Sequence, residues 1–200
     1  MRNPIVLFIT LIFFLSCAEN RPNKENKVVE KSIQTFFSLG MEGQSLVEFD
    51  LDTIETTKEL IRILNEIDCL KEKPVLKIET DYKINRIQPF QICEFILDYK
   101  LKNIIYVNTD SITVNYDLVL PIDSLEITLK NHLLNPNNNE NYPSQLEKKM
   151  ISIHIDSTKN ISDTKNLFLN IIDKVNRLDS IPDFIFMIED NGILPEYTEE

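Results

Sequence analysis

From Leu46 onward, the spacing of apolar residues switches repeatedly between short alternating runs and stretches of helical period. An alternating run fits a strand, because successive side chains point to opposite faces of a sheet. Apolar residues that recur at three- and four-residue steps instead form one face of a helix. Strands that alternate with helices along a chain are typical of α/β proteins. The sequence therefore predicts an α/β fold.

Two successive units with the order strand, helix, strand, helix, strand are predicted over residues 46–110 and 111–191. Their expected strands are short runs rich in β-branched residues: 46–50, 75–80, 104–107, 112–120, 150–156 and 184–188. The repeated order indicates helices packed on mixed sheets and an internal duplication of about 75 residues. One continuous mixed sheet is the alternative. An acidic tail, residues 192–200, follows the second unit.

Each unit is expected to contain two helices. Short polar residues suit helix N-caps, and proline suits a helix end or a first turn. The expected caps and breaks are Asp52 or Thr53, Pro74, Pro89, and Ser162 or Asp163. The clearest helix is the last one, whose apolar stripe extends over more than two turns and comprises Leu167, Phe168, Ile171, Ile172, Val175 and Leu178.

The N-terminus has the pattern of an export signal. Arg2 precedes an apolar run over residues 5–15, and Ser16-Cys17 follows it. This order matches a positive start, a hydrophobic middle and a small residue before a cleavage site. The apolar run would form about 18 Å of helix against a hydrocarbon core of about 30 Å, so a membrane span is the weaker interpretation.

The segment Phe14-Leu15-Ser16-Cys17 resembles the lipobox of bacterial lipoproteins, although Phe14 stands where Leu is usual. The resemblance implies that residues 1–16 are a signal peptide and that the Cys17 thiol takes a diacylglycerol and becomes the mature N-terminus. Acyl chains contribute roughly 0.8 kcal/mol per buried methylene, so they would hold the chain at a membrane. A plain secretory signal with an incidental Cys is the alternative.

Residues 17–45 are expected to contain the lipidated Cys and a flexible tether. The part from residue 18 to residue 31 is polar, contains Pro22 and lacks a repeating apolar face. Cleavage after residue 16 would leave 20 basic and 32 acidic side chains, a formal balance of −12. Such a surface repels nucleic acid phosphates and anionic head groups, so no nucleic acid partner is expected.

Cofactor and metal motifs are missing from the sequence. The only glycines are Gly40, Gly43 and Gly192, so neither of the two nucleotide-binding glycine loops can be formed. Zinc sites of the usual spacing are also excluded, because the candidate ligands are scattered: His132, His154, Cys17, Cys69 and Cys93. No cofactor and no metal site is therefore predicted.

Cysteine and histidine chemistry offers few candidates. Cys69 and Cys93 lie in adjacent predicted helices, so an exported protein could join them by a disulfide, although a helical Cys is more often a small buried hydrophobe. His154 shares a strand face with Met150 and Ser152. Because no nucleophile motif accompanies it, we expect a partly exposed, locally hydrogen-bonded residue and no catalytic group.

Carboxylates gather at three places, and oxygen ligands of this kind can hold a hard cation. The clusters are Glu48, Asp50 and Asp52; Glu79 and Asp81; and Glu189 and Asp190. None has the spacing of a calcium loop, and some clustering is expected of 32 acids. A solvated rim is therefore the preferred interpretation. An enzyme that uses Asp50, Asp81 or Asp156 as paired acids is the alternative.

The predicted units resemble the periplasmic domain of the ExbD/TolR family, small βαβαβ modules of energy-coupled envelope systems. In the first unit, the corresponding segments are residues 75–81, the helix through Ile92 and Ile96, and residues 103–107. In the second unit, they are residues 150–156, 167–175 and 184–188. The family's transmembrane helix with its Asp has no counterpart in the apolar run 5–15, so the proton-motor role does not transfer. Leu101-Lys102-Asn103 also stands where the family tends to have Gly before its last strand.

This resemblance implies a binding or scaffolding domain, because such modules dimerise and engage extended peptide segments. Together with the lipobox, it predicts a lipid-anchored protein of the bacterial envelope, facing the periplasm or the cell surface, whose non-catalytic domain binds another protein. An exposed sheet edge is the expected contact, since its backbone can accept an added strand. A receptor for a small ligand is a further alternative.

Overall fold

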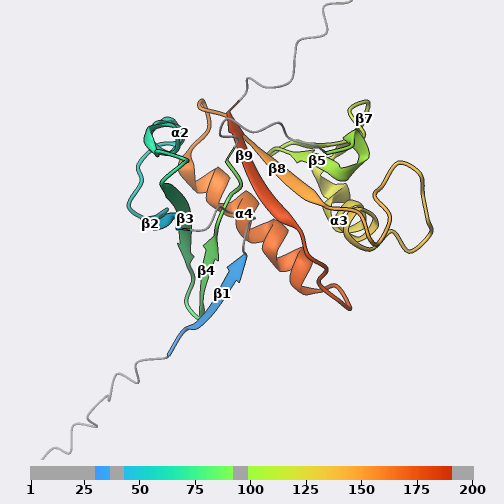
Figure 1. Cartoon of the computed structure of the whole chain (residues 1–200), viewed down its shortest axis with the longest axis horizontal. Helices are drawn as coiled ribbons and strands as arrows, with labels where there is room; N and C mark the ends of the chain where they lie inside the picture. The colour runs from blue at the N-terminus through green and yellow to red at the C-terminus, as the bar shows by residue number, and fades with distance from the viewer. Residues whose placement is uncertain (1–29, 37–42, 92–98, 191–200) are drawn as a thin grey trace, which may run out of the picture. The chain divides into compact units, whose positions relative to one another are not determined.

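The structure, a computed structural model, describes residues 30–36, 43–91 and 99–190. Within these ranges the chain forms a four-stranded sheet, a five-stranded sheet and three α-helices (Figure 1). Both sheets lie in one unit of the chain, Lys31–Glu200. The predicted α/β class, with helices packed on mixed sheets, is confirmed.

The four-stranded sheet has the order β1-β4-β3-β2. Its strands are β1 (Ser32–Phe36), β2 (Ser45–Asp50), β3 (Glu72–Glu79) and β4 (Lys83–Ile87). Strands β2 and β3 are parallel, and helix α2 (Thr57–Glu66) connects them, because parallel neighbours need a crossover. Strand β4 runs antiparallel to β3, and β1 runs parallel to β4 at one edge.

The five-stranded sheet has the order β7-β6-β5-β8-β9. Strands β5 (Ile104–Val107), β6 (Ser111–Val114) and β7 (Leu118–Pro121) form an antiparallel meander. Strands β8 (Met150–Ile155) and β9 (Ile185–Asp190) then run parallel to β5. Helices α3 (Leu125–Leu134) and α4 (Ile161–Asn176) precede these two strands and supply the crossovers. Two short 3-10 helices, Leu101–Asn103 and Ile122–Ser124, precede β5 and α3.

One hydrophobic core serves both sheets. The buried stripe of α4 forms its centre and consists of Leu167, Phe168, Ile171, Ile172 and Val175, in agreement with the predicted stripe. Phe186 of β9 lies 6.2 Å from Phe168 and 5.6 Å from Phe36 of β1, measured between ring centroids. The aromatic rings therefore join a strand of each sheet to the same helix.

The element order differs from the prediction in five strands. The strand over residues 104–107, expected to close the first unit, instead lies in the middle of the five-stranded sheet. Strand β1 lies within residues 17–45, which were expected to be a tether, and β4 was not predicted. The expected strand 112–120 is divided into β6 and β7 by a turn. The sheets differ in strand number and order, so the structure does not show an internal duplication.

The predicted helix caps are also corrected. Helix α2 begins at Thr57, because Thr56 is its N-cap and accepts a hydrogen bond from the Glu59 amide. Asp52 forms an ion pair with Lys165 of α4, and the Thr53 hydroxyl donates to the Asp50 carbonyl. The same helix ends at Glu66, well before Pro74, which lies in β3. The N-cap of α4 is Asn160, in place of Ser162 or Asp163.

Several predicted segments lie outside the described residues. They are the signal peptide 1–16, Cys17 with most of the tether, the part of the second predicted helix that contains Cys93, and the tail 192–200. In the part of the chain that the structure describes, no helix has the length and apolar character needed to cross a bilayer.

We expect Phe186→Ala to lower the free energy of unfolding by about 3–5 kcal/mol, because the substitution leaves a cavity where both sheets meet α4. Chemical denaturation followed by circular dichroism measures this change. Ile33→Ala is the matched control, since Ile33 lies on β1 and is exposed. A loss below about 1 kcal/mol for Phe186→Ala would contradict a shared core.

Candidate functional site

The acids of β2 and β3 form an ion-pair network on the sheet face that points away from the core. Glu48 lies 2.7 Å from Arg86, and Asp50 lies 2.8 Å from Lys77. Glu79 contacts both Lys31 and Lys77, at 2.8 and 2.9 Å. The hydrogen bonds from these two lysines lower the pKa of Glu79 to about 2. Glu48, Asp50 and Glu79 of the predicted acid clusters are therefore compensated by neighbouring lysines and arginine.

The three acids proposed as catalytic partners lie in different local environments. The hydrogen bond from Lys77 lowers the pKa of Asp50. Asp81 is exposed in the turn between β3 and β4. Asp156 follows β8 and accepts hydrogen bonds from the hydroxyl and the amide of Thr158, which lower its pKa. The structure therefore does not bring these three acids together in one pocket.

A cluster of interacting side chains lies on the face of the five-stranded sheet opposite α3 and α4. His154 of β8 is paired in register with Glu189 of β9, and His154 Nε2 lies 3.0 Å from Glu189 Oε2. The Glu189 side chain is only 4% exposed, so the expected solvated rim is wrong for this acid. His154 is partly exposed, as expected, but its Nε2 forms no hydrogen bond with a described residue, so the expected local hydrogen bond is not seen at this atom.

Two tyrosines extend this cluster toward β6 and β7. The Tyr106 ring lies 5.2 Å from His154 and packs edge-on against it, and the hydroxyls of Tyr106 and Tyr116 are 2.8 Å apart. Burial, with the hydrogen bond to Tyr116 second, raises the pKa of Tyr106. Tyr116 has a left-handed backbone with φ of 69°, in the turn between β6 and β7. Its contacts with Tyr106 hold this unusual turn against the sheet.

This cluster lacks the contacts that covalent catalysis requires. Ser152 lies between Met150 and His154 on β8 and is fully buried, but its hydroxyl has no hydrogen-bond partner. A serine nucleophile needs a base within hydrogen-bond reach. Ser152 Oγ forms no hydrogen bond with His154. We therefore interpret these residues as a polar cluster within a packed sheet face. No group of acids, histidines and cysteines suited to a metal occurs among the described residues.

A cavity of about 260 Å³ lies beside Glu189, between α2 and β9. Ile61 and Leu64 of α2 line one side, and Met187 and Glu189 of β9 line the other. Cys69 also lines the cavity and is disulfide-bonded. The pairing of Cys69 with Cys93 remains a prediction, because Cys93 lies outside the described residues.

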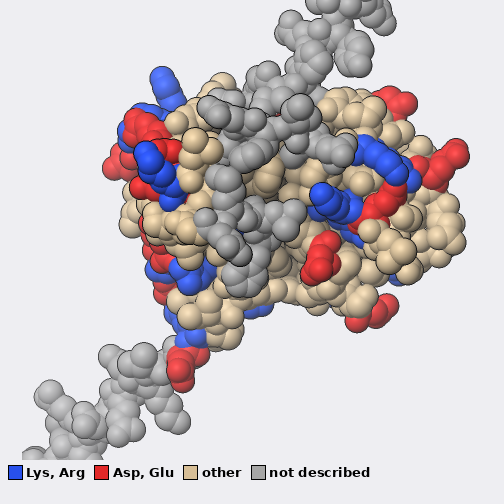
Figure 2. Space-filling view, viewed as in Figure 1, with Lys and Arg blue, Asp and Glu red and all other residues tan. Residues whose placement is uncertain are grey.

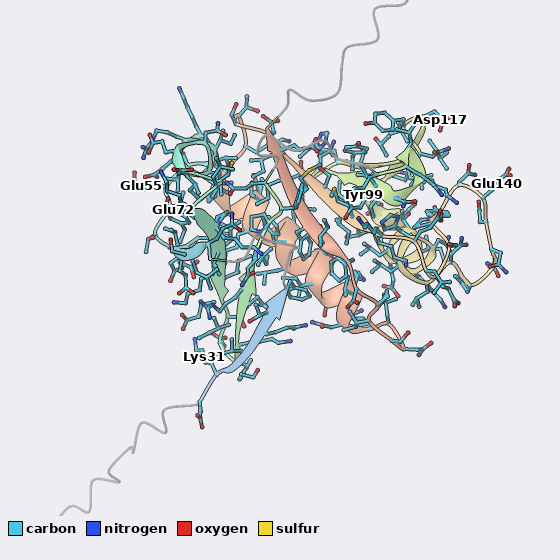
Figure 3. The ribbon with its side chains drawn as sticks, viewed as in Figure 1. Lys31, Glu55, Glu72, Tyr99, Asp117 and Glu140 are labelled. Carbon is cyan, nitrogen blue, oxygen red and sulfur yellow. The ribbon has the colours of Figure 1, made fainter. Side chains whose placement is uncertain are left out.

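Among the described residues, strand β7 forms one edge of the five-stranded sheet and is the least buried of its strands. Leu118 is 41% exposed, Val119 is 63% exposed, and Pro121 is exposed as well. No charged residue lies within β7, and the label of Asp117 in Figure 3 marks the turn that precedes it. The opposite edge strand, β9, is contacted by Phe90, whose amide donates to the Phe186 carbonyl at 2.7 Å. Strand β7 therefore offers an apolar edge for an added strand.

Comparisons with known proteins give no relative for this chain. No protein-family model matches it, and no curated protein or solved structure matches it significantly.

His132 is the second imidazole of the chain, and α3 places it in the interior. Its side chain is fully buried, and burial lowers its pKa to about 3. The imidazole is therefore neutral in the folded protein at neutral pH. It belongs to the core rather than to a site.

The unfolding free energy should fall by about 2 kcal/mol between pH 7 and pH 5, because the unfolded chain protonates His132 and the folded chain does not. This contribution is fully present above about pH 6.5 and is lost as the pH falls toward the folded pKa of about 3. Denaturation of the wild type and of His132→Leu at each pH measures it. Equal pH slopes for the two proteins over this window would contradict the assignment.

Proposed function

We propose that this protein is a lipid-anchored component of the bacterial cell envelope whose folded part binds another protein without catalysing a reaction. The anchor is a diacylglycerol on Cys17, exposed when a signal peptide of residues 1–16 is removed. The lipobox-like sequence Phe14 to Cys17, after Arg2 and the apolar run 5–15, supports this proposal. The folded part then lies on the periplasmic or outer side of a membrane.

The binding role is inferred from the position and exposure of the edge strand β7. Among the described residues its backbone has one neighbouring strand, β6, and three of its four side chains are exposed. An extended segment of a partner can add to such an edge through main-chain hydrogen bonds, while pockets for alternate side chains give selectivity. Leu118 and Val119 point to opposite faces of the sheet, so an added strand meets an apolar side chain on both faces.

The resemblance to ExbD/TolR periplasmic domains supports the same role for one of the two predicted units. The segments 150–156, 167–175 and 184–188 correspond to β8, α4 and β9, which follow one another as strand, helix and strand. The first set of segments fits less well, because β3 and β5 lie in different sheets. The likeness is thus one of element order, and it adds to the proposal an analogy with binding modules.

A small-ligand-binding lipoprotein is the second candidate function. The cavity between α2 and β9 favours it, because apolar walls are combined there with the buried carboxylate of Glu189. Its volume of about 260 Å³ lies just below the usual range of small-molecule sites, so only a small apolar ligand with a polar group would fit.

We expect the mature protein to begin at Cys17 and to carry acyl chains, and Cys17→Ser to abolish both the acylation and the membrane attachment. Intact-mass spectrometry of native material and fractionation of cell envelopes measure these properties. An Asn23→Ser variant, which changes the same N-terminal region and leaves the Cys17 thiol in place, is the control. Native protein that retains residues 1–16 would contradict the anchor.

Val119→Lys should weaken binding of the envelope partner at least tenfold, because a charge on the edge strand opposes addition of another strand. Ile127→Lys is the matched control, since Ile127 is similarly exposed but lies on α3. Quantitative co-purification from detergent-solubilised envelopes compares the two variants with wild type. Equal recovery of the partner by both variants would contradict binding at β7.

A further inference from the structure

A lysine-rich surface lies where two distant segments of the chain meet. We define the lysine patch as Lys100, Leu101, Lys102, Leu146 and Lys148. Glu147 joins the segments, because its carboxylate lies 2.6 Å from Lys100 Nζ and 3.1 Å from Lys102 Nζ. Lys148 Nζ lies 5.6 Å from the centre of the Tyr99 ring. Figure 2 shows blue side chains around a red one in the right half of the view.

The lysine patch opposes the general charge of the protein. The whole chain has a formal charge of −11, yet the described segments that form the patch, residues 99–103 and 144–148, contain three lysines and one acid, Glu147. The hydrogen bond from Lys100 is the main cause that lowers the pKa of Glu147 to about 2, so this acid stays ionised. Each ammonium group has three donors, so Lys100 and Lys102 can contact a further anion while they hold Glu147.

Two apolar side chains project between the lysines. Leu146 is 100% exposed and Leu101 is 54% exposed. Exposed leucines next to several lysines suit the boundary of a bilayer. There the apolar side chains enter the acyl region while the lysine stems extend to the phosphates.

The position of the patch is compatible with a membrane anchor. Lys102 lies just before β5 and Lys148 just before β8, so the patch lies at the starting ends of two parallel strands. The edge along β7 runs lengthwise at the side of the same sheet and lies outside the patch. The residues from Cys17 to Glu30 can span up to about 50 Å, so a chain anchored at Cys17 can turn the patch toward the bilayer.

We propose that the lysine patch is a membrane-contact surface that binds anionic phospholipid headgroups and orients the anchored protein with the β7 edge exposed. This proposal rests on the lipid anchor of the proposed function. Near a charged membrane each lysine contributes only a weak attraction, which is too little to hold a free protein. It becomes effective once the anchor keeps the patch close to the surface.

A single introduced tryptophan tests the proposal, because the chain contains no Trp of its own. The lipidated full-length mature protein with Leu146→Trp is reconstituted into two kinds of vesicles, pure phosphatidylcholine and an equal mixture with phosphatidylglycerol. We expect a blue-shifted emission and quenching by brominated acyl chains only on the anionic vesicles. Val119→Trp is the control, since it places the reporter on the exposed β7 edge, and its emission should be the same on both.

Charge variants in the Leu146→Trp background make the test specific. Lys100→Gln with Lys148→Gln should abolish the blue shift, whereas Lys58→Gln with Lys130→Gln, which removes the same charge at two exposed positions elsewhere, should leave it unchanged. A protein that fails to float with vesicles contradicts the anchor and the patch together. A protein that floats but whose introduced tryptophan emits identically on both vesicles contradicts the patch alone, as expected if an acidic protein segment occupied it.

Discussion

The packing of α4 against both sheets is the constraint on which the rest of the structure depends. Its apolar stripe occupies the common core, and polar contacts at both its ends bind other elements. Lys165 contacts Asp52 after β2, Lys174 contacts Glu126 of α3, and Asn176 hydrogen-bonds Gln34 of β1. Neither sheet alone encloses a core of this size. The two sheets are therefore held together by burial of one helix and not by a sheet that runs through both.

This arrangement determines which surfaces are free for interactions. Helices α3 and α4 cover one face of the five-stranded sheet, and the cluster around Tyr106 and Glu189 fills much of the other face. Phe90 occupies part of the β9 edge, so β7 remains as the apolar edge of the five-stranded sheet in the described part of the chain. The lysine patch lies at the strand ends. An orientation in which the strand ends face a membrane and the β7 edge faces a partner follows from this division.

The sequence predicted those features that depend on local periodicity. The helix α4 was identified from its long apolar stripe, and β8 and β9 were placed correctly because their runs are flanked by clear breaks. The assignment of β5 to the first unit failed because a strand's own residues do not specify its neighbours. Strand β1 was missed because its five residues are partly exposed and follow a polar segment.

The surfaces were harder to predict than the fold. Glu189 was expected in a solvated rim, but the register of β8 and β9 places it against His154. A local sequence pattern does not reveal which residues of two neighbouring strands lie side by side. The lysine patch was not predicted either, because its residues lie more than 40 positions apart and are joined only through Glu147. The apolar character of β7 was visible in the sequence, whereas its place at the sheet edge required the topology.

Native-state hydrogen exchange tests the shared core most directly, because it measures the opening free energy of each sheet separately. Amides of β3 in the four-stranded sheet and of β8 in the five-stranded sheet should exchange with the same opening free energy. Their exchange should also respond equally when the α4 stripe is weakened by Ile171→Val. Exchange of β3 through openings that leave β8 protected would contradict the account, because the two sheets would then be separate folding units.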